Sequence, residues 1–381
     1  MNRYLQLFFS LLKMVSVPLL NFMTLFLGIK FYGKENWGEF ISISIWIFFM
    51  AFMAKWSGQN YLSKEFNKNT STYLSIFYSN ILERCVLLLP SIALFFIFPF
   101  QEALSAVILL ILLFIYNSYE ALIVYNQKFQ FQFLAEITGM IIIFIGFVVF
   151  PVFSLTTIFY VLSVSYLVKI CMLLVTFKHS FEKINISFSF MNLVHTFPFF
   201  LIGFSGWLAS KCDIYVVSIF FSKKELSEYQ ILISFFLMLQ AIPAYLILPV
   251  NKHLFRLSQI SIKKIKKKLA LIALPIIVLS SLFIWFVITF FIKIQFSFLI
   301  YFFATLSTIP TFFYLVDMMQ LYKKNKEKII MKLSFVTASL NLIILFLLTP
   351  NFRILGAIIS ICIAQWLYLF FIKKKIKNDL S

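Results

Sequence analysis

Residues 104–126 read LSAVILLILLFIYNSYEALIVYN, an apolar stretch with a single charged side chain, Glu120. A helix needs roughly 20 apolar residues to cross the hydrocarbon core of a bilayer, and this stretch meets that length. The rest of the chain repeats the pattern, because 62% of its 381 residues are hydrophobic and only 12% are charged. Soluble domains are about 45–50% apolar and about 25% charged. We therefore predict an all-α integral membrane protein.

Division of the chain at its polar clusters gives about twelve spans. Their approximate ranges are 5–29, 39–55, 74–98, 104–126, 131–151, 155–177, 191–220, 228–250, 269–291, 295–321, 330–349 and 354–372. The first six spans form a predicted N-lobe, 1–177. Residues 178–190 form a cytoplasmic linker, and 191–381 form a C-lobe of six spans with a basic tail.

Basic residues gather in alternate loops, which fixes the predicted topology. The clusters 252–268, 323–332 and 373–377 fall on the side of the two termini. The other side holds only Lys30, Lys34, Lys223, Lys224, Lys293 and Arg353. Cytoplasmic loops carry an excess of Lys and Arg, so both termini are predicted to be cytoplasmic. This asymmetry explains the net charge of +19 without a nucleic-acid partner. The most basic stretch, 263–268, is expected either to anchor this topology or to hold anionic lipid headgroups.

An internal repeat relates two loops half a chain apart. Residues 31–40 read FYGKENWGEF, and residues 220–229 read FFSKKELSEY. Both contain two aromatic residues, a small residue and Lys, followed by an apolar or aromatic residue, a small residue, Glu and an aromatic residue. The alternative is a chance similarity of two interfacial loops. A true repeat predicts two parallel six-helix lobes, an arrangement in which substrate binds between lobes and access alternates.

Nine charged residues lie inside the predicted spans, away from the first and last few residues of each span. A charge at the bilayer centre costs at least about 2.5–3.5 kcal/mol, so each should face the bundle interior, pair with an opposite charge, or reach an interface. The candidate substrate-binding residues are Lys13, Arg84, Lys211 and Asp213. The candidates for ion coupling or pairing between helices are Glu83, Glu120 and Asp317. Lys169 and Glu136 complete the set, and Glu136, Glu120 and Asp317 lie near predicted cytoplasmic ends. For Glu83 and Arg84, pairing between helices of one lobe is the open alternative.

Local spacing refines three of these candidates. Lys13 precedes Pro18, and a proline inside a helix favours a bend beside this cation. Trp207 and Lys211 are four residues apart and share a helix face, which allows a cation-π contact. Lys211 and Asp213 do not share a face, so Asp213 needs another partner, such as a cation of a neighbouring span.

Catalytic and metal-binding motifs are missing from the sequence. It has no phosphate-binding glycine loop, no metal-spaced cluster of His and acids, and no Gly-x-Ser-x-Gly elbow. The four cysteines, Cys85, Cys171, Cys212 and Cys362, all fall in apolar runs and are expected to act as small apolar residues. We therefore expect no cofactor, no metal and no enzymatic activity, with transport driven by an ion gradient or by the substrate gradient.

The order of several short motifs resembles a family of exporters. The motifs are Leu27-Gly28, Phe31-Tyr32-Gly33, Trp37-Gly38 and Ser57-Gly58 in the first half, and 198–213, Ser227-Glu228-Tyr229 and Pro249 in the second. Over essentially the whole chain the sequence resembles O-antigen flippases of the Wzx type. These belong to the polysaccharide exporter branch of the multidrug/oligosaccharidyl-lipid/polysaccharide (MOP) superfamily.

That resemblance implies twelve helices in two lobes around a central cavity, a fold like that of multidrug (MATE) transporters. It also implies transport of undecaprenyl-pyrophosphate-linked oligosaccharide from the cytoplasmic to the periplasmic leaflet of a bacterial inner membrane. Alternating access would be coupled to H⁺ or Na⁺, with membrane lipids and the polymerase and chain-length proteins of the pathway as partners. Asp213 stands where the family often has Asp followed by a basic residue. Ile214 follows here, so Lys211 is the candidate substitute for that base.

Two other functions remain open. A multidrug antiporter of the same superfamily would bind cations, which a buried Lys13 would repel. The O-antigen polymerase is a membrane enzyme that acts on the same lipid-linked sugars. It normally has a long periplasmic loop with basic residues, whereas every periplasmic loop predicted here is short.

Overall fold

The described part of the protein consists of long helices and contains no strand. The computed structural model describes residues 3–56, 61–62, 65–66, 72–177, 187–254, 259–324 and 326–380. It divides into two compact units, Met1–Gly203 and Phe204–Ser381. The predicted linker, 178–190, lies largely outside the described residues, and the proposed lobe boundaries stay predictions.

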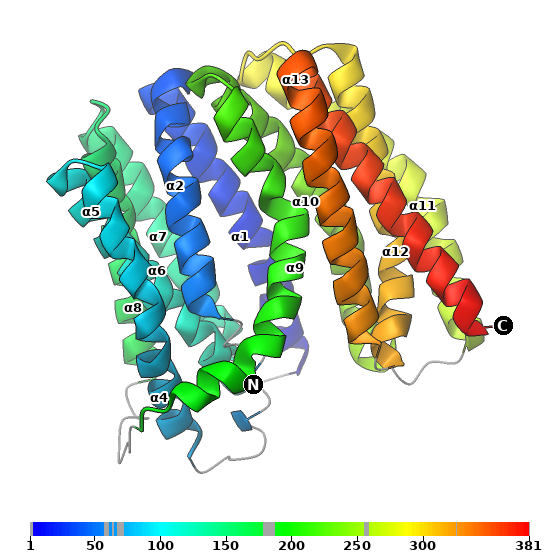
Figure 1. Cartoon of the computed structure of the whole chain (residues 1–381), viewed down its shortest axis with the longest axis horizontal. Helices are drawn as coiled ribbons and strands as arrows, with labels where there is room; N and C mark the ends of the chain where they lie inside the picture. The colour runs from blue at the N-terminus through cyan, green and yellow to red at the C-terminus, as the bar shows by residue number, and fades with distance from the viewer. Residues whose placement is uncertain are drawn as a thin grey trace. The chain divides into compact units, whose positions relative to one another are not determined.

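The described residues of the first unit form seven α-helices and the first part of another, α9. They are α1 (Arg3–Tyr32), α2 (Lys34–Lys55), α4 (Tyr73–Cys85), α5 (Leu94–Ile97), α6 (Phe100–Asn126), α7 (Phe129–Val149), α8 (Leu155–Thr176) and α9 (Phe190–Phe220). Helix α7 packs against α1 and α8, and α6 packs against α2 and α8 (Figure 1). Between α4, α6 and α8, the side chains of Phe77, Leu122 and Leu173 are fully buried.

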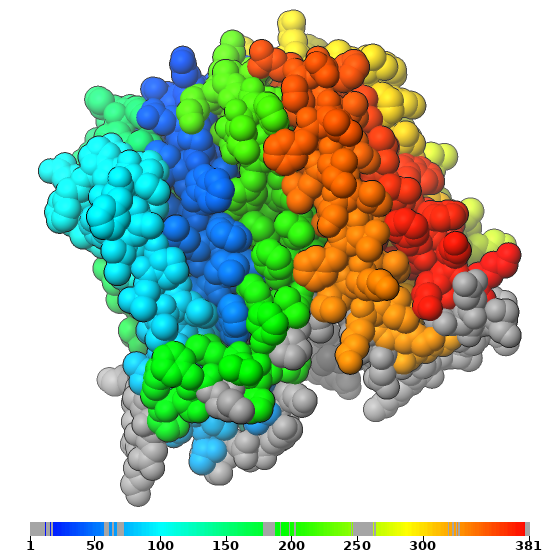
Figure 2. Space-filling model, in the orientation of Figure 1, coloured from blue at the N-terminus to red at the C-terminus, as the bar shows by residue number. Residues whose placement is uncertain are grey.

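A short 3-10 segment, η1 (Val86–Ala93), joins α4 to α5. It contains Pro90, which has no backbone N–H to donate within a helix. The segment and the following α5 present large apolar side chains outward, as Leu89 of η1 is 60% and Phe96 of α5 is 86% exposed. Figure 2 shows this stretch, in cyan, at the surface. Such a surface is stable in lipid and would be unusual in a soluble monomer.

In the second unit, the described residues form the rest of α9 and four further α-helices. They are α10 (Lys223–Leu254), α11 (Gln259–Phe286), α12 (Phe298–Lys323) and α13 (Glu327–Leu380). Helix α12 is central, because it packs against α10, α11 and α13. A single π-helical turn, η3 (Val287–Phe291), extends α11.

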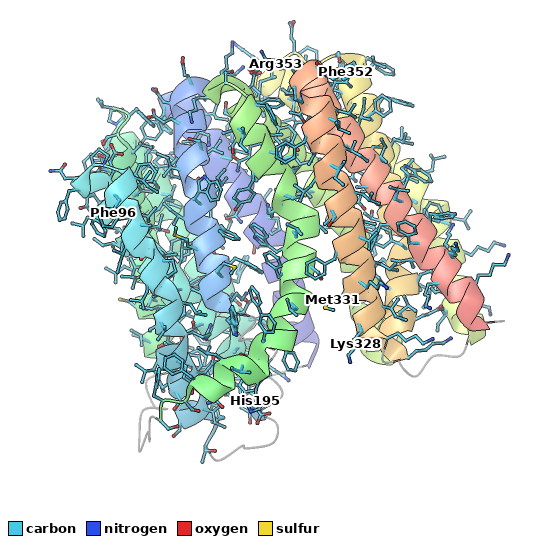
Figure 3. The ribbon with its side chains drawn as sticks, in the orientation of Figure 1. Phe96, His195, Lys328, Met331, Phe352 and Arg353 are labelled. Atoms are coloured by element: carbon cyan, nitrogen blue, oxygen red, sulfur yellow. The ribbon has the colours of Figure 1, made fainter. Side chains whose placement is uncertain are left out.

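Helix α13 contains two of the predicted spans. Its backbone leaves the helical conformation at Arg353, where φ is 53° and ψ is −135°, three residues after Pro350. Figure 3 shows Phe352 and Arg353 at this bend, with Lys328 and Met331 toward the opposite end of the first arm. The predicted spans 330–349 and 354–372 are therefore the two arms of α13.

The number of membrane crossings agrees with the sequence-based expectation. Nine helices of the described chain are long and apolar enough to cross a membrane, and the bent α9 makes a tenth. Because α13 is counted once there and contains two arms, it adds another crossing. Helix α1 adds the twelfth crossing, because its described residues include the shorter apolar helical stretch Pro18–Tyr32. The prediction of an all-α membrane protein with about twelve spans is confirmed.

The two repeat loops form corresponding turns between helices. Gly33 separates α1 from α2 with φ 83° and ψ 164°, a conformation that is essentially restricted to glycine. Ser222 precedes α10 and forms a capping box with Glu225. The Ser222 N–H donates to Glu225 Oε2 at 3.0 Å, and the Glu225 N–H donates to Ser222 Oγ at 3.3 Å. Arg353 Nη1 also lies 2.8 Å from Glu225 Oε2, joining this turn to the bend of α13.

We predict that Gly33→Ala lowers the midpoint of thermal unfolding in detergent. The substitution forces a Cβ into a conformation that costs a residue other than glycine about 1–3 kcal/mol. Gly206→Ala is the matched control, because neither glycine has an atom within 4 Å of an added Cβ and only Gly33 has a positive φ. The control should unfold at or slightly above the wild-type temperature. Equal midpoints for the two variants would contradict this account of the turn.

Candidate functional site

The charged residues of the first unit hold its helices together. Arg84, on α4, is 1% exposed. Its Nη1 donates to the backbone oxygen of Lys55 at 2.9 Å, and its Nη2 donates to Ser118 Oγ at 3.1 Å. Its guanidinium also lies 5.3 Å from the ring centroid of Phe114. Because Lys55 is the last residue of α2, Arg84 places its charge at the negative end of that helix.

Glu83 points to a different neighbour. It is 1% exposed, and its Oε1 accepts the side-chain N–H of Asn192 at 2.6 Å and the backbone N–H of Ser189 at 3.2 Å. One turn earlier on α4, Ser79 Oγ accepts the backbone N–H of Ser187 at 2.9 Å. A carboxylate is favourable at a helix N-terminus, so Glu83 fixes the start of α9 to α4.

Glu120 and Lys55 form an ion pair between α6 and α2. Lys55 Nζ lies 2.7 Å from Glu120 Oε2, and both side chains are about one quarter exposed. Lys55 thus contacts Glu120 through its side chain and Arg84 through its backbone. The partners of Arg84 and Glu120 belong to helices of the predicted N-lobe, whereas Glu83 contacts Ser189 and Asn192, which lie beyond that lobe.

A buried ion pair that the sequence did not reveal joins α7 to α8. Lys169 Nζ lies 2.7 Å from Glu136 Oε2, and these residues are 6% and 8% exposed. The hydroxyl of Tyr116 donates to Glu136 Oε1 at 2.6 Å, and Lys169 Nζ lies 4.5 Å from the ring centroid of Tyr166. Of the three possibilities expected for a charge in a span, Glu136 shows pairing with an opposite charge inside the bundle.

Gly139 provides the space for this pair. A Cβ on Gly139 would lie 2.0 Å from Lys169 Cε and 2.8 Å from Ser165 Oγ, far inside normal contact distances. The hydroxyl of Ser165 donates to the backbone oxygen of Gly139 at 3.0 Å, which fixes the close approach of the two helices. The sequence signal available for this site was Gly139, which follows Glu136 by about one helical turn inside a predicted span.

In the second unit, Asp213 faces inward from α9. It is 7% exposed and accepts a short hydrogen bond from the hydroxyl of Tyr229, on α10, which is fully buried. The partner is a phenol and not the cation that the sequence suggested. The preceding residue, Cys212, contacts Asn341 of α13 through an Nδ2–Sγ distance of 3.4 Å. This turn of α9 is therefore tied to both α10 and α13.

Lys211 differs from every other described charge within the spans. It lies near the middle of the Gly203–Phe220 part of α9, and its side chain is exposed. It has no hydrogen bond or ion pair within the described chain. Aromatic residues flank it on the same face. The ring of Trp207 stacks on Phe204 with centroids 6.1 Å apart, and its centroid lies 5.4 Å from that of Tyr215.

Two other candidates lie elsewhere. Lys13 is on α1, five residues before Pro18, but its side chain lies outside the described residues. Asp317, on α12, is 5% exposed and forms an ion pair with Lys266 of α11. In the described part of the chain, no group of three His, Cys, Asp or Glu residues is arranged to hold a metal ion. All four cysteines are free, with Cys212 and Cys362 buried.

Comparison with known proteins supports the fold. No protein-family model matches the chain, and no curated protein sequence matches it. Among solved structures, the chain is similar to one described as the lipid II flippase MurJ in an inward closed conformation. The TM-score is 0.67 with 16% sequence identity, and the match covers 97% of this chain and 87% of the other. The chain therefore has the same fold as this structure.

We predict that Glu136→Gln and Lys169→Met each lower the thermal unfolding midpoint strongly. Removing one partner of a buried ion pair leaves an uncompensated charge, at a cost of about 3–5 kcal/mol in proteins studied. The double variant should recover most of the loss, because it removes both charges. Glu120→Gln is the control, since its more exposed pair should contribute at most about 1 kcal/mol. A double variant with the summed loss of the two single variants would contradict the pairing.

Proposed function

We propose that this protein is a flippase for undecaprenyl-pyrophosphate-linked oligosaccharide, such as an O-antigen repeat unit. It would carry this lipid from the cytoplasmic to the periplasmic leaflet of a bacterial inner membrane. The observation that carries the proposal is Lys211, an exposed lysine in the middle of a membrane span with no hydrogen bond or ion pair in the described chain.

The position of Lys211 argues for a hydrated surface around it. At a rise of 1.5 Å per residue, Lys211 is roughly 13 Å from the end of α9 at Phe220. A lysine so deep cannot easily reach the interface, and exposure to lipid would cost at least about 2.5–3.5 kcal/mol. We infer that this face of α9 lines the polar path through the membrane.

A pyrophosphate suits that path. It carries more than one negative charge, and a lysine in a low-dielectric cavity binds phosphate oxygens through charge-assisted hydrogen bonds. The aromatic residues Trp207 and Tyr215 beside Lys211 provide flat surfaces of the kind that pack against sugar rings or isoprenoid chains. A cationic drug would be repelled at the same place, which disfavours a multidrug antiporter.

The shared fold supports a lipid-linked substrate, because the similar structure is described as a flippase of lipid II. The choice of O-antigen or a similar repeat unit rests on the sequence motifs that resemble Wzx-type flippases. Alternating access of the two lobes, coupled to H⁺ or Na⁺, completes the proposed mechanism. Asp213 lies two residues after Lys211 and accepts a hydrogen bond from Tyr229. It is the carboxylate nearest in sequence to the proposed path.

The remaining candidates receive different roles. Lys13, beside Pro18 on α1, is proposed as a second contact for the pyrophosphate. Glu83, Arg84 and Glu120 are proposed to hold the first unit rigid while substrate moves, because their partners belong to that unit. Asp317 is proposed to play the same structural role in the second unit, because Lys266 neutralises it there.

The leaflet position of the lipid-linked oligosaccharide tests the function directly. In a strain without this gene, a membrane-impermeant sugar label would be applied to intact and to opened spheroplasts. We expect single repeat units to be labelled only after opening, because they remain on the cytoplasmic face. Single units that reach the periplasmic face without polymerising would instead identify a polymerase. No change in either pool would exclude both functions.

We predict that Lys211→Ala reduces transport by at least about tenfold while membrane insertion stays normal, since the substrate loses a charge-assisted contact worth more than about 1.4 kcal/mol. Lys211→Arg should retain part of the activity because it keeps the charge. Lys224→Ala, which removes an exposed lysine at the start of α10, is the control and should transport normally. The assay is the same leaflet labelling in a complemented strain, and full activity of Lys211→Ala would remove this residue from the path.

A further inference from the structure

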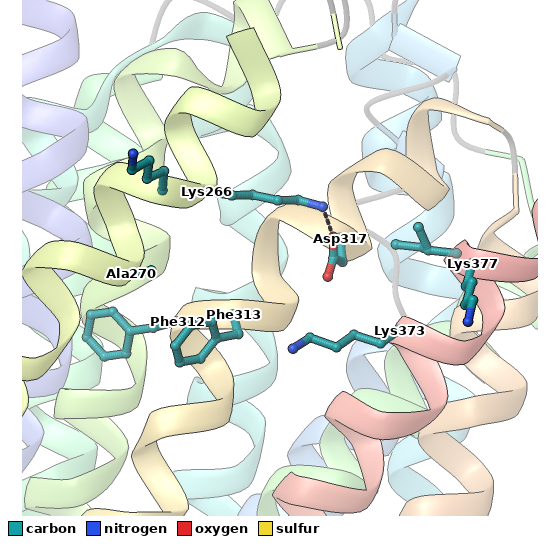
Figure 4. Close-up of a pocket in the computed structure, with 9 residues that line it drawn as sticks. Lys266, Ala270, Phe312, Phe313, Asp317, Lys373 and Lys377 are labelled. Atoms are coloured by element: carbon teal, nitrogen blue, oxygen red, sulfur yellow. Dashed lines mark hydrogen bonds and ion pairs between the residues drawn. The ribbon is translucent and has the colours of Figure 1, made fainter. Parts of the chain in front are cut away.

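The second unit contains a pocket at the end where α11 begins and where α12 and α13 finish. Its volume is about 760 Å³. Its lining consists of four lysines, one acid and four apolar residues: Lys266, Lys267, Lys373, Lys377, Asp317, Ala270, Phe312, Phe313 and Ile376. Figure 4 shows Lys266 of α11 reaching Asp317 of α12, while Lys373 extends from α13 toward the same space. No residue of α9 belongs to it.

The pocket carries an excess of positive charge. Asp317 is its one acid, and Lys266 already neutralises it. Lys373 Nζ lies 5.6 Å from the ring centroid of Phe313. Lys267, Lys373 and Lys377 are exposed, and none of them has an ion pair in the described part of the chain. Three uncompensated lysines that converge from two helices form a favourable position for an anion.

The same pocket is apolar on its other side. Ala270, Phe312 and Phe313 line this side, and Phe312 belongs to a buried apolar cluster against which Phe313 packs. Directly after Ala270, α11 continues with outward apolar side chains, among which Leu271 is 66% and Leu274 is 67% exposed. Lys266 and Lys267 stand at the beginning of the membrane span of α11, and Lys373 and Lys377 stand at the end of the span of α13. The charged part therefore lies at a membrane interface and the apolar part faces the acyl chains.

We propose that this pocket binds the phosphate headgroup of an anionic glycerophospholipid, with the acyl chains along α11. The basic residues of this end are those that the sequence assigns to the cytoplasmic side, so the ligand would come from the cytoplasmic leaflet. Anionic lipid attracts each nearby Lys or Arg with about 1 kcal/mol, and a pocket that orients three lysines adds selectivity to this attraction. The site does not depend on the transported substrate.

Native mass spectrometry of the full-length protein in detergent tests the proposal, with phosphatidylglycerol as the probe. The pocket variant is the triple substitution Lys267→Gln, Lys373→Gln and Lys377→Gln, which leaves the Lys266–Asp317 pair intact. The control is Lys264→Gln, Lys268→Gln and Lys374→Gln. It removes the same charge from exposed lysines of the same two helices, and none of these lines the pocket.

We expect phosphatidylglycerol to bind the pocket variant on the order of tenfold more weakly than it binds the wild-type protein. It should bind the control variant about as well as the wild-type protein. Phosphatidylcholine should bind weakly to all three proteins. Equal losses in both variants would mean diffuse attraction to a basic surface and would overturn the site. Inorganic phosphate that displaces phosphatidylglycerol at equal concentration would also overturn it, because the pocket would then recognise a soluble anion.

Discussion

Compensation of charge inside the membrane is the constraint on which this structure depends. A charge in the hydrocarbon core needs a partner or water, because a charge that is left exposed to lipid costs several kcal/mol. In the first unit, Glu136 is satisfied by Lys169 and Tyr116. Arg84 is satisfied by groups of α2 and α6. These contacts connect α2, α4, α6, α7 and α8, so the polar residues also decide which helices are neighbours.

The same constraint separates the charges that are paired within the bundle from the one proposed to bind substrate. Asp213 is directed inward and held by Tyr229, whereas Lys211, two residues earlier on α9, is exposed. On the proposed function, α9 has one face that packs within the bundle and another that meets the substrate. A flippase needs such a face, because a charged lipid headgroup must cross the membrane while its chains remain in lipid. A lysine-bearing surface lowers that barrier for an anion.

Hydropathy was sufficient to predict the helices, because each span must satisfy its own backbone in lipid. The expected ranges 104–126 and 155–177 agree with α6 and α8 to within a few residues. Pairing was not predictable in the same way. Glu136 and Lys169 come from different helices, and their contact depends on the space left by Gly139. For Asp213, a search for cations overlooked Tyr229, whose hydroxyl satisfies a carboxylate without any charge.

The hydration of the Lys211 face is the central claim, and cysteine labelling measures it most directly. In a variant without native cysteines, Lys211→Cys would be treated in the membrane with a small hydrophilic thiol reagent. Leu279→Cys, on the outward surface of α11 where Leu279 is 67% exposed, provides the lipid-facing comparison. The account predicts that Lys211→Cys reacts and Leu279→Cys does not. Equal lack of reaction at both positions would place Lys211 against lipid and contradict a polar path along α9.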